Sequence, residues 1–158
     1  MDSTSYYNTI KDSYEKSYRE EQIGKIRKIL SLIKILDVGA GTGILEELLK
    51  DYDITAIEPS DLYYIMSKKR LNSKLIKADF LSFESEEKFD IVFAITVIQD
   101  INIENREKFI KKLFNLTKNG GKIVISVLNR SGIDLDYLRP INKICVENDI
   151  VYVFNKAN

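Results

Sequence analysis

Short apolar runs alternate with amphipathic segments through most of this chain. Runs that predict buried strands occupy residues 35–38, 53–57, 74–77 and 89–95, and a fifth strand follows a glycine turn within 116–128. Apolar residues with helical spacing are found in 60–71 and 104–117. Strands that alternate with helices indicate a parallel sheet flanked by helices, and therefore an α/β fold.

The helical segments have defined inward faces. The side chains expected to face the core are Leu62, Ile65, Met66 and Leu71 in the first helix and Phe109, Ile110, Leu113 and Leu116 in the second. The amino-terminal segment, from about residue 4 to residue 33, carries apolar residues at spacings of three and four. It predicts a helix with a break near residues 17–20.

The carboxyl-terminal part predicts shorter elements. A polar loop and a single helical turn are expected at residues 79–88 and 134–138. Two apolar strands at 143–147 and 150–154 flank Asn148 and Asp149, a pair that tolerates the positive φ angles of a type I′ turn. The chain is therefore expected to end in a β-hairpin.

The most informative local pattern is a strand that leads into three alternate glycines and an amphipathic helix, within residues 35–49. Gly39, Gly41 and Gly43 let the backbone turn sharply and approach a ligand that a Cβ would push away. Asp37 lies at the carboxyl end of the strand, where open α/β sheets bind ligands. Its carboxylate would repel a phosphate and attract an ammonium or sulfonium group, so the pattern favours a cationic ligand.

This D-x-G-x-G-x-G pattern, with a strand before it and a helix after it, resembles motif I of the class I S-adenosylmethionine-dependent methyltransferases. Further matches follow in order over residues 33–129, and the chain resembles the small single-domain type found among the ubiquinone and menaquinone biosynthesis methyltransferases. The resemblance implies a three-layer fold with a mostly parallel seven-stranded sheet, order 3-2-1-4-5-7-6, strand 7 antiparallel and helices on both faces. It also implies one domain over residues 1–158, with about residues 1–32 as a helical lid over the cofactor.

The resemblance places a cofactor site at the carboxyl ends of the first four strands. It implies that Glu58 accepts hydrogen bonds from both ribose hydroxyls of S-adenosylmethionine and that Asp79 and Phe80 hold the adenine. Thr96 and Gln99 are the candidates for contact with the methyl acceptor. The expected cofactor-binding residues are Asp37, Gly39, Ala40, Gly41, Gly43, Glu58, Pro59, Asp79, Phe80, Ile95 and, from the lid, Tyr7.

Each position also has a purely structural interpretation. The glycine run could be an ordinary strand-to-helix turn, and Glu58 could be a solvated strand end. Asp79 could cap a turn, and Thr96 could begin a helix. Because parallel strands would bring Asp37, Glu58 and Asp79 to one edge of the sheet, the joint interpretation as a ligand site is favoured.

Composition agrees with one domain, because 158 residues with 44% hydrophobic content can build a single core. The 24 basic and 24 acidic residues give a formal net charge of zero, which provides no overall attraction to nucleic acid or to an anionic membrane. The chain contains no apolar stretch of about 20 residues and its start lacks the features of a secretory signal, so we expect a cytoplasmic protein without membrane contact. The single cysteine, Cys145, falls in an apolar strand pattern that predicts a buried packing role, and without histidine no metal site is expected.

Missing motifs narrow the chemistry further. Family members that methylate planar exocyclic or amide nitrogens usually carry an Asp/Asn-Pro-Pro-Tyr/Phe motif after the fourth strand. Residues 95–98 occupy that place and lack the motif. They also include no cysteine, which a covalent thiolate mechanism would need. A general base would have to be Asp, Glu, Tyr, Lys or a bound water. We expect a methyltransferase with a small-molecule substrate. Three alternatives stay open: a methyltransferase that acts on protein or RNA and requires a partner, a non-catalytic subunit that binds S-adenosylmethionine, and a dinucleotide oxidoreductase. The sequence does not indicate the oligomeric state.

Overall fold

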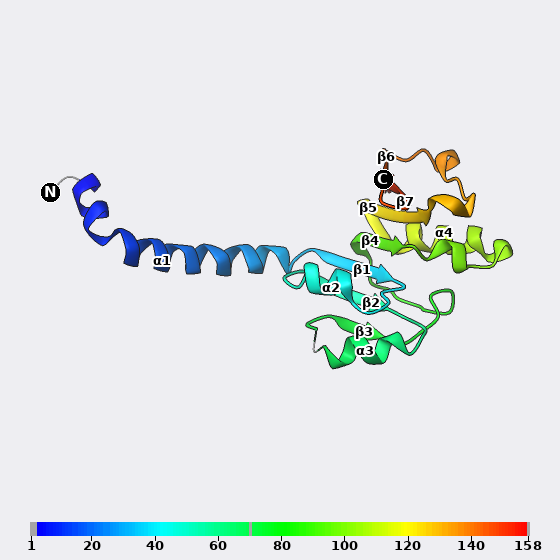
Figure 1. The fold of residues 1–158 in the computed structure, drawn as a ribbon, viewed down its shortest axis with the longest axis horizontal. Coiled ribbons are helices and arrows are strands. Elements are labelled where there is room, and N and C mark those ends of the chain that lie inside the picture. The colour runs from blue at the N-terminus through cyan, green and yellow to red at the C-terminus, as the bar shows by residue number, and fades with distance from the viewer. Residues whose placement is uncertain (1–2, 70, 158) are drawn as a thin grey trace.

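The computed structural model describes residues 3–69 and 71–157, with the side chains of residues 15–63, 65–69 and 71–157. One seven-stranded sheet forms its centre, in the order β3-β2-β1-β4-β5-β7-β6 (Figure 1). Strands β1 to β5 pair in parallel, and β7 pairs antiparallel with both β5 and β6. The strands are β1 (Lys34–Val38), β2 (Asp53–Ile57), β3 (Lys74–Ile76), β4 (Phe89–Ile95), β5 (Thr117–Leu128), β6 (Asn142–Val146) and β7 (Asp149–Asn155). The predicted strand order and the antiparallel strand 7 are confirmed.

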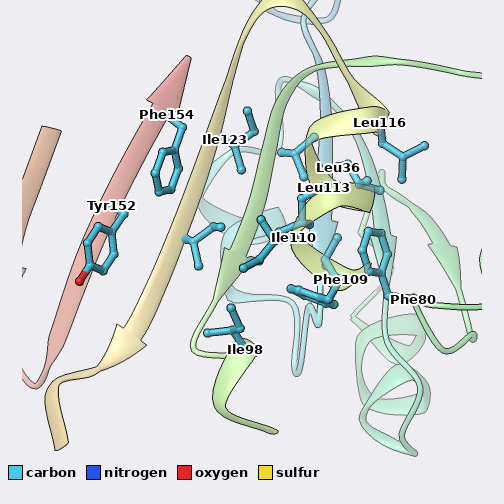
Figure 2. Close-up of a cluster of buried hydrophobic side chains, with 14 of the residues drawn as sticks. Leu36, Phe80, Ile98, Phe109, Ile110, Leu113, Leu116, Ile123, Tyr152 and Phe154 are labelled. Atoms are coloured by element: carbon cyan, nitrogen blue, oxygen red, sulfur yellow. The ribbon is translucent and has the colours of Figure 1, made fainter. Parts of the chain in front are cut away.

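Helix α4 closes one face of the sheet. Its inward side chains Phe109, Ile110, Leu113 and Leu116 are buried, as predicted, and pack with alternate residues of the central strands (Figure 2). Phe80 joins this cluster, with its ring edge-on to Phe109 at 5.1 Å between centroids. The main core therefore lies between α4 and the strands β1, β4, β5 and β7.

Two shorter helices lie on the opposite face. In β1, Leu36 and Val38 belong to the α4 core, so Asp37 between them faces the other way, towards Glu46 of α2. The Met66 side chain of α3 is fully buried and packs beside Gly43, at the start of α2. The helices are α1 (Ser3–Leu30), α2 (Ile44–Leu48), α3 (Leu62–Lys68) and α4 (Ile103–Leu116), and the 3-10 turns are η1 (Ile98–Asp100), η2 (Asn129–Ser131) and η3 (Asp136–Leu138).

Helix α1 is continuous, so the predicted break near residues 17–20 is wrong. This stretch contains neither glycine nor proline and is exposed, so an interrupted apolar pattern there does not disturb the backbone hydrogen bonds. The helix joins β1 at the amino edge of the sheet and extends away from the other elements (Figure 1). It does not cover the carboxyl edge in this structure, and its closure over a cofactor stays a prediction. None of the helices in the described residues combines the length and apolar character needed to span a bilayer.

Some local predictions were wrong. Cys145 is exposed because it lies on the edge strand β6, whose residues are all exposed. Leu62 and Ile65 are 39% and 44% exposed, because the short helix α3 buries only Met66 fully. The hairpin turn is shifted by one residue, since Val146 pairs with Asp149 and the positive φ of +52° falls on Glu147. The loop at 79–88 and the helical turn near 134–138 are confirmed.

Candidate cofactor and acceptor site

The glycine turn after β1 lies against the end of β2. The backbone N–H groups of Gly39 and Ala40 both donate to the carbonyl of Ile57, at 2.8 and 3.1 Å. Gly39 has φ +76°, and a Cβ there would come within 2.5 Å of the Val97 side chain in the segment after β4. A side chain is therefore excluded from this position both by conformation and by space.

Gly41 differs from Gly39 in what surrounds it. Its φ is +58°, and no described atom lies within 4 Å of the place where a Cβ would be. Its N–H donates to Oε2 of Glu58 at 2.9 Å. The turn therefore presents an open concave backbone surface beside two acidic positions, Asp37 and Glu58.

Glu58 is 7% exposed and is bound on both carboxylate oxygens. Oε2 accepts the Gly41 N–H, and Oε1 accepts the Ser60 N–H at 2.9 Å and the Ser60 hydroxyl at 2.5 Å. A carboxylate can accept about four hydrogen bonds, so three of these acceptor positions are occupied within the chain. A ribose with two hydroxyls would find room for one hydrogen bond unless Ser60 turns away.

A second buried acid, which the sequence interpretation missed, accompanies Asp37. Asp37 and Glu46 are 3% and 1% exposed, and within the described chain neither carboxylate oxygen of Glu46 has a hydrogen-bond donor. Burial raises the pKa of Asp37 well above its usual range, and repulsion from Glu46 and Glu58 raises it further. Burial also raises the pKa of Glu46, and Lys69 partly opposes that rise. A proton shared by the two acids satisfies both while no cation is present.

Asp79 and Phe80 follow β3, and their side chains lie in different surroundings. Asp79 is exposed and caps a turn, because its Oδ2 accepts the Ser82 N–H at 3.1 Å. The Phe80 ring is 5% exposed and packs against Phe109 on the α4 side. The Phe80 ring therefore belongs to the α4 core, and contact of Asp79 and Phe80 with the adenine stays a prediction.

The two acceptor-side candidates follow β4. Thr96 has φ +56°, which is uncommon for a β-branched residue, and its hydroxyl donates to Oδ2 of Asp149 at 2.7 Å. It does not cap a helix, since the residue at the start of η1 is Val97. The Gln99 Nε2 donates to the Thr96 carbonyl at 2.5 Å, while its buried Oε1 has no donor within the described chain.

The other expected contacts are spread over the same edge. Ala40 is half-buried within the glycine turn, Pro59 is exposed next to Glu58, and Ile95 is 42% exposed at the end of β4. The Tyr7 side chain lies outside the described residues. Two cavities differ in whether predicted site residues line them. One of about 360 Å³ is lined in part by Ile95. A larger groove of about 620 Å³ lies between α4 and the loop at residues 79–88, and it includes none of the predicted site residues.

The residues at this edge fit a cationic ligand such as S-adenosylmethionine. The backbone at Gly41 leaves open space that a Cβ would fill, and the unpartnered oxygens of Glu46 lie behind Asp37. A buried acid without a donor is destabilising unless a proton or a cation compensates it. An ammonium or sulfonium group supplies that compensation, whereas a pyrophosphate would add repulsion.

Comparison with known proteins agrees with this geometry. Residues 36–125 match the family model described as "Methyltransferase domain". The chain is 27% identical over 121 residues to a ubiquinone biosynthesis O-methyltransferase of Pseudomonas fluorescens, covering 71% of this chain and 49% of that protein. It thus spans about half the length of the curated relatives it matches.

Solved structures share the fold. TehB from Haemophilus influenzae has a TM-score of 0.67 at 18% identity, covering 92% of this chain and 66% of that one. The N-methyltransferase NodS from Bradyrhizobium japonicum WM9 has a TM-score of 0.66 at 15% identity, covering 91% and 99%. At these identities the likeness concerns the fold.

Proposed function

The chain belongs to the class I S-adenosylmethionine-dependent methyltransferase family, and from that premise we propose that it is an enzyme that transfers a methyl group from this cofactor to a small molecule. The observation that carries the proposal is the pair of buried acids, Asp37 and Glu46, behind the open turn at Gly41. An intact cationic-ligand site is what a working member of the family needs. It also weighs against the alternative of a non-catalytic subunit that merely keeps the fold.

The residues of this chain would bind and orient rather than react. Asp37 and the glycine turn would hold the methionine and ribose portion, and Glu58 would accept a ribose hydroxyl. S-adenosylmethionine, when bound, supplies an activated methyl on a good leaving group. The protein then has to hold an acceptor in line with that methyl group and to exclude water. Such positioning can lower the barrier to the reaction.

A small acceptor is favoured over a macromolecule by two observations. The formal net charge is zero, so the chain offers no general attraction to RNA. The cavity beside Ile95, of about 360 Å³, has the scale of a small organic molecule. The printed name of the curated relatives, which are ubiquinone biosynthesis O-methyltransferases, is consistent with a small-molecule role. A protein or RNA acceptor stays as the second candidate.

Alanine at either acidic position should weaken cofactor binding. We expect Asp37→Ala and Glu58→Ala each to raise the Kd for S-adenosylhomocysteine at least tenfold, about 1.4 kcal/mol, in isothermal titration calorimetry. Asp53→Asn is the matched control, because Asp53 is an exposed acid at the opposite, amino edge of β2. Unchanged affinity in both alanine variants would contradict the assigned site. Stronger thermal stabilisation by NAD than by S-adenosylhomocysteine would favour an oxidoreductase instead.

The nature of the acceptor can be sorted by the fate of a labelled methyl group. The protein would be incubated with methyl-labelled S-adenosylmethionine and fractionated cell extract. Label in the small-metabolite fraction is the expected result. Label in protein or RNA would favour the second candidate, and no transfer to any fraction would favour a binding subunit.

A further inference from the structure

A hydrogen-bonded polar cluster joins the ends of β4, β5 and β7. The hydroxyls of Thr96 and Ser126 both donate to Oδ2 of Asp149, each at 2.7 Å. The Ser126 hydroxyl in turn accepts the backbone N–H of Thr96 at 2.8 Å. One oxygen of Asp149 is thus fixed by two donors, which leaves Oδ1 to accept a hydrogen bond from another partner.

The cluster opens into the cavity of about 360 Å³ at the carboxyl edge. The apolar part of the lining comes from the side chains of Ile95, Leu128, Val146 and Val151, and the polar part comes from Ser126, Glu147, Asn148 and Asp149. This lining contains two acids and no lysine or arginine. An apolar cavity with acidic groups and no basic group favours an organic cation over an anion.

The cavity lies on the same sheet face as Asp37. Ile125, Val127 and Tyr152 belong to the α4 core, so their neighbours Ser126 and Val151 face the opposite side. Asp37 faces that side as well, since Leu36 and Val38 point to α4. The cavity at β4, β5 and β7 therefore lies on the same face of the sheet as the candidate cofactor residues at β1 and β2, and β4 is the neighbour of β1.

The sheet order then separates the two substrates. If the proposed function holds, the ribose end of the cofactor is at Glu58 after β2, and its charged sulfur end is at Asp37 in β1. The acceptor must approach from the other neighbour of β1, which is β4. Thr96 follows β4 directly, and Asp149 is hydrogen-bonded to it.

We propose that Asp149 is the acceptor-side catalytic residue, and that the cavity takes a small amine on an apolar body, whose ammonium group hydrogen-bonds to Oδ1 of Asp149. This inference rests on the proposed function and names the substrate class of the same site. An aliphatic amine is compatible with the absence of the motif used for planar exocyclic and amide nitrogens. Thr96 and Ser126 act as positioning residues, because both of their hydroxyls donate to the same oxygen of Asp149.

The step balances with the groups present. The bound ammonium transfers one proton to the Asp149 carboxylate, and the freed nitrogen lone pair attacks the methyl carbon. A nitrogen–carbon bond forms while the carbon–sulfur bond breaks, and its electron pair stays on sulfur to give neutral S-adenosylhomocysteine. The positive charge moves to the methylated nitrogen, and Asp149 later releases its proton to water.

The test uses the full chain saturated with S-adenosylhomocysteine and labelled in its isoleucine and valine methyl groups. Benzylamine, benzyl alcohol and benzoate are the probes, and methyl NMR follows Ile95 and Val151. We expect benzylamine to shift these resonances in a saturable way, benzyl alcohol to bind at least tenfold more weakly, and benzoate not to bind. In Asp149→Asn the benzylamine Kd should rise at least tenfold, while the Kd for S-adenosylhomocysteine is unchanged.

Controls separate this inference from its alternatives. Asp53→Asn removes the same charge at the opposite edge and should leave benzylamine binding unchanged. If Asp149 only ties β7 to β4, Asp149→Asn lowers the unfolding temperature but not the benzylamine affinity, which would overturn the inference. Tighter binding of benzyl alcohol, or no shift by benzylamine in the saturated protein, would overturn it too. If the wild-type chain does not bind S-adenosylhomocysteine, the proposed function itself is contradicted, and the premise of this inference is removed with it.

Discussion

Gly41→Ala should lower the affinity for S-adenosylhomocysteine at least a hundredfold, about 2.7 kcal/mol. The added methyl would meet no protein atom within 4 Å, so it does not collide with the fold. It would instead fill the open space above the turn, where the ligand has to approach the backbone. Isothermal titration calorimetry on both proteins measures the change directly.

Gly132→Ala is the matched control for this variant. Gly132 has φ +69° and, like Gly41, no described atom within 4 Å of the point that an added methyl group would occupy. Both substitutions force alanine into the left-handed region and should lower the free energy of unfolding by about 1–2 kcal/mol. Only Gly41→Ala should weaken the ligand. Equal affinities in the two variants would show that the turn is structural and does not contact the cofactor.

The affinity for S-adenosylmethionine should rise with pH above the usual carboxyl range. Burial raises the pKa values of both Asp37 and Glu46, and Glu58 adds repulsion at Asp37 while Lys69 favours the charged form of Glu46. A cationic ligand favours the ionised acids, so binding releases the shared proton. Release of one proton makes Kd fall by up to tenfold per pH unit, or about a hundredfold over two units. Calorimetry at a series of pH values measures the slope.

The stability of the ligand-free protein should change in the opposite direction. An acid whose pKa is raised by folding binds its proton more tightly in the folded state, so its contribution to stability is lost as pH rises from about 4 towards the raised pKa. Glu46→Gln removes one acid and gives Asp37 an amide donor. We expect it to increase the free energy of unfolding by about 1–3 kcal/mol at pH 8, with a smaller gain at pH 5.

Glu47→Gln provides the comparison for the stability measurement. Glu47 is the next residue on α2, but its side chain is 49% exposed and pairs with Lys69 at 3.0 Å. Because Glu47 is exposed, its removal should change the pH dependence of urea unfolding much less than Glu46→Gln does. A Glu46→Gln protein whose gain in stability is the same at pH 5 and pH 8 would contradict the coupled-acid interpretation.

The sheet could be predicted from the sequence because its strands are nearly continuous apolar runs. Ile54 and Ile57 in β2, and Val92 and Ala94 in β4, are buried as the runs indicate. The same reasoning failed for Cys145, since an apolar strand pattern does not reveal that β6 has a neighbour on one side only. It failed for Leu62 and Ile65 because a helix of two turns on a narrow part of the sheet cannot bury a full apolar face.

The candidate site was predictable where a residue type is required by the backbone conformation or falls directly after a strand. The glycine turn and Glu58 are of this kind, and the hydrogen bond between Gly41 and Glu58 joins them. Glu46 was missed because it lies between leucine and glutamate in α2, where helical periodicity expects a leucine inside and an acid outside. Asp149 was interpreted as a turn residue. Its contact with Thr96, 53 residues away along the chain, arises because β5 pairs with both β4 and β7.

The hydrogen bond from Gly41 to Glu58 has a consequence for the speed of ligand capture. Because the loop is already fastened to the neighbouring strand, an incoming ligand meets a preorganised surface and gives up little conformational entropy of the protein. Capture of the ligand at this turn should then require no slow rearrangement of the loop itself.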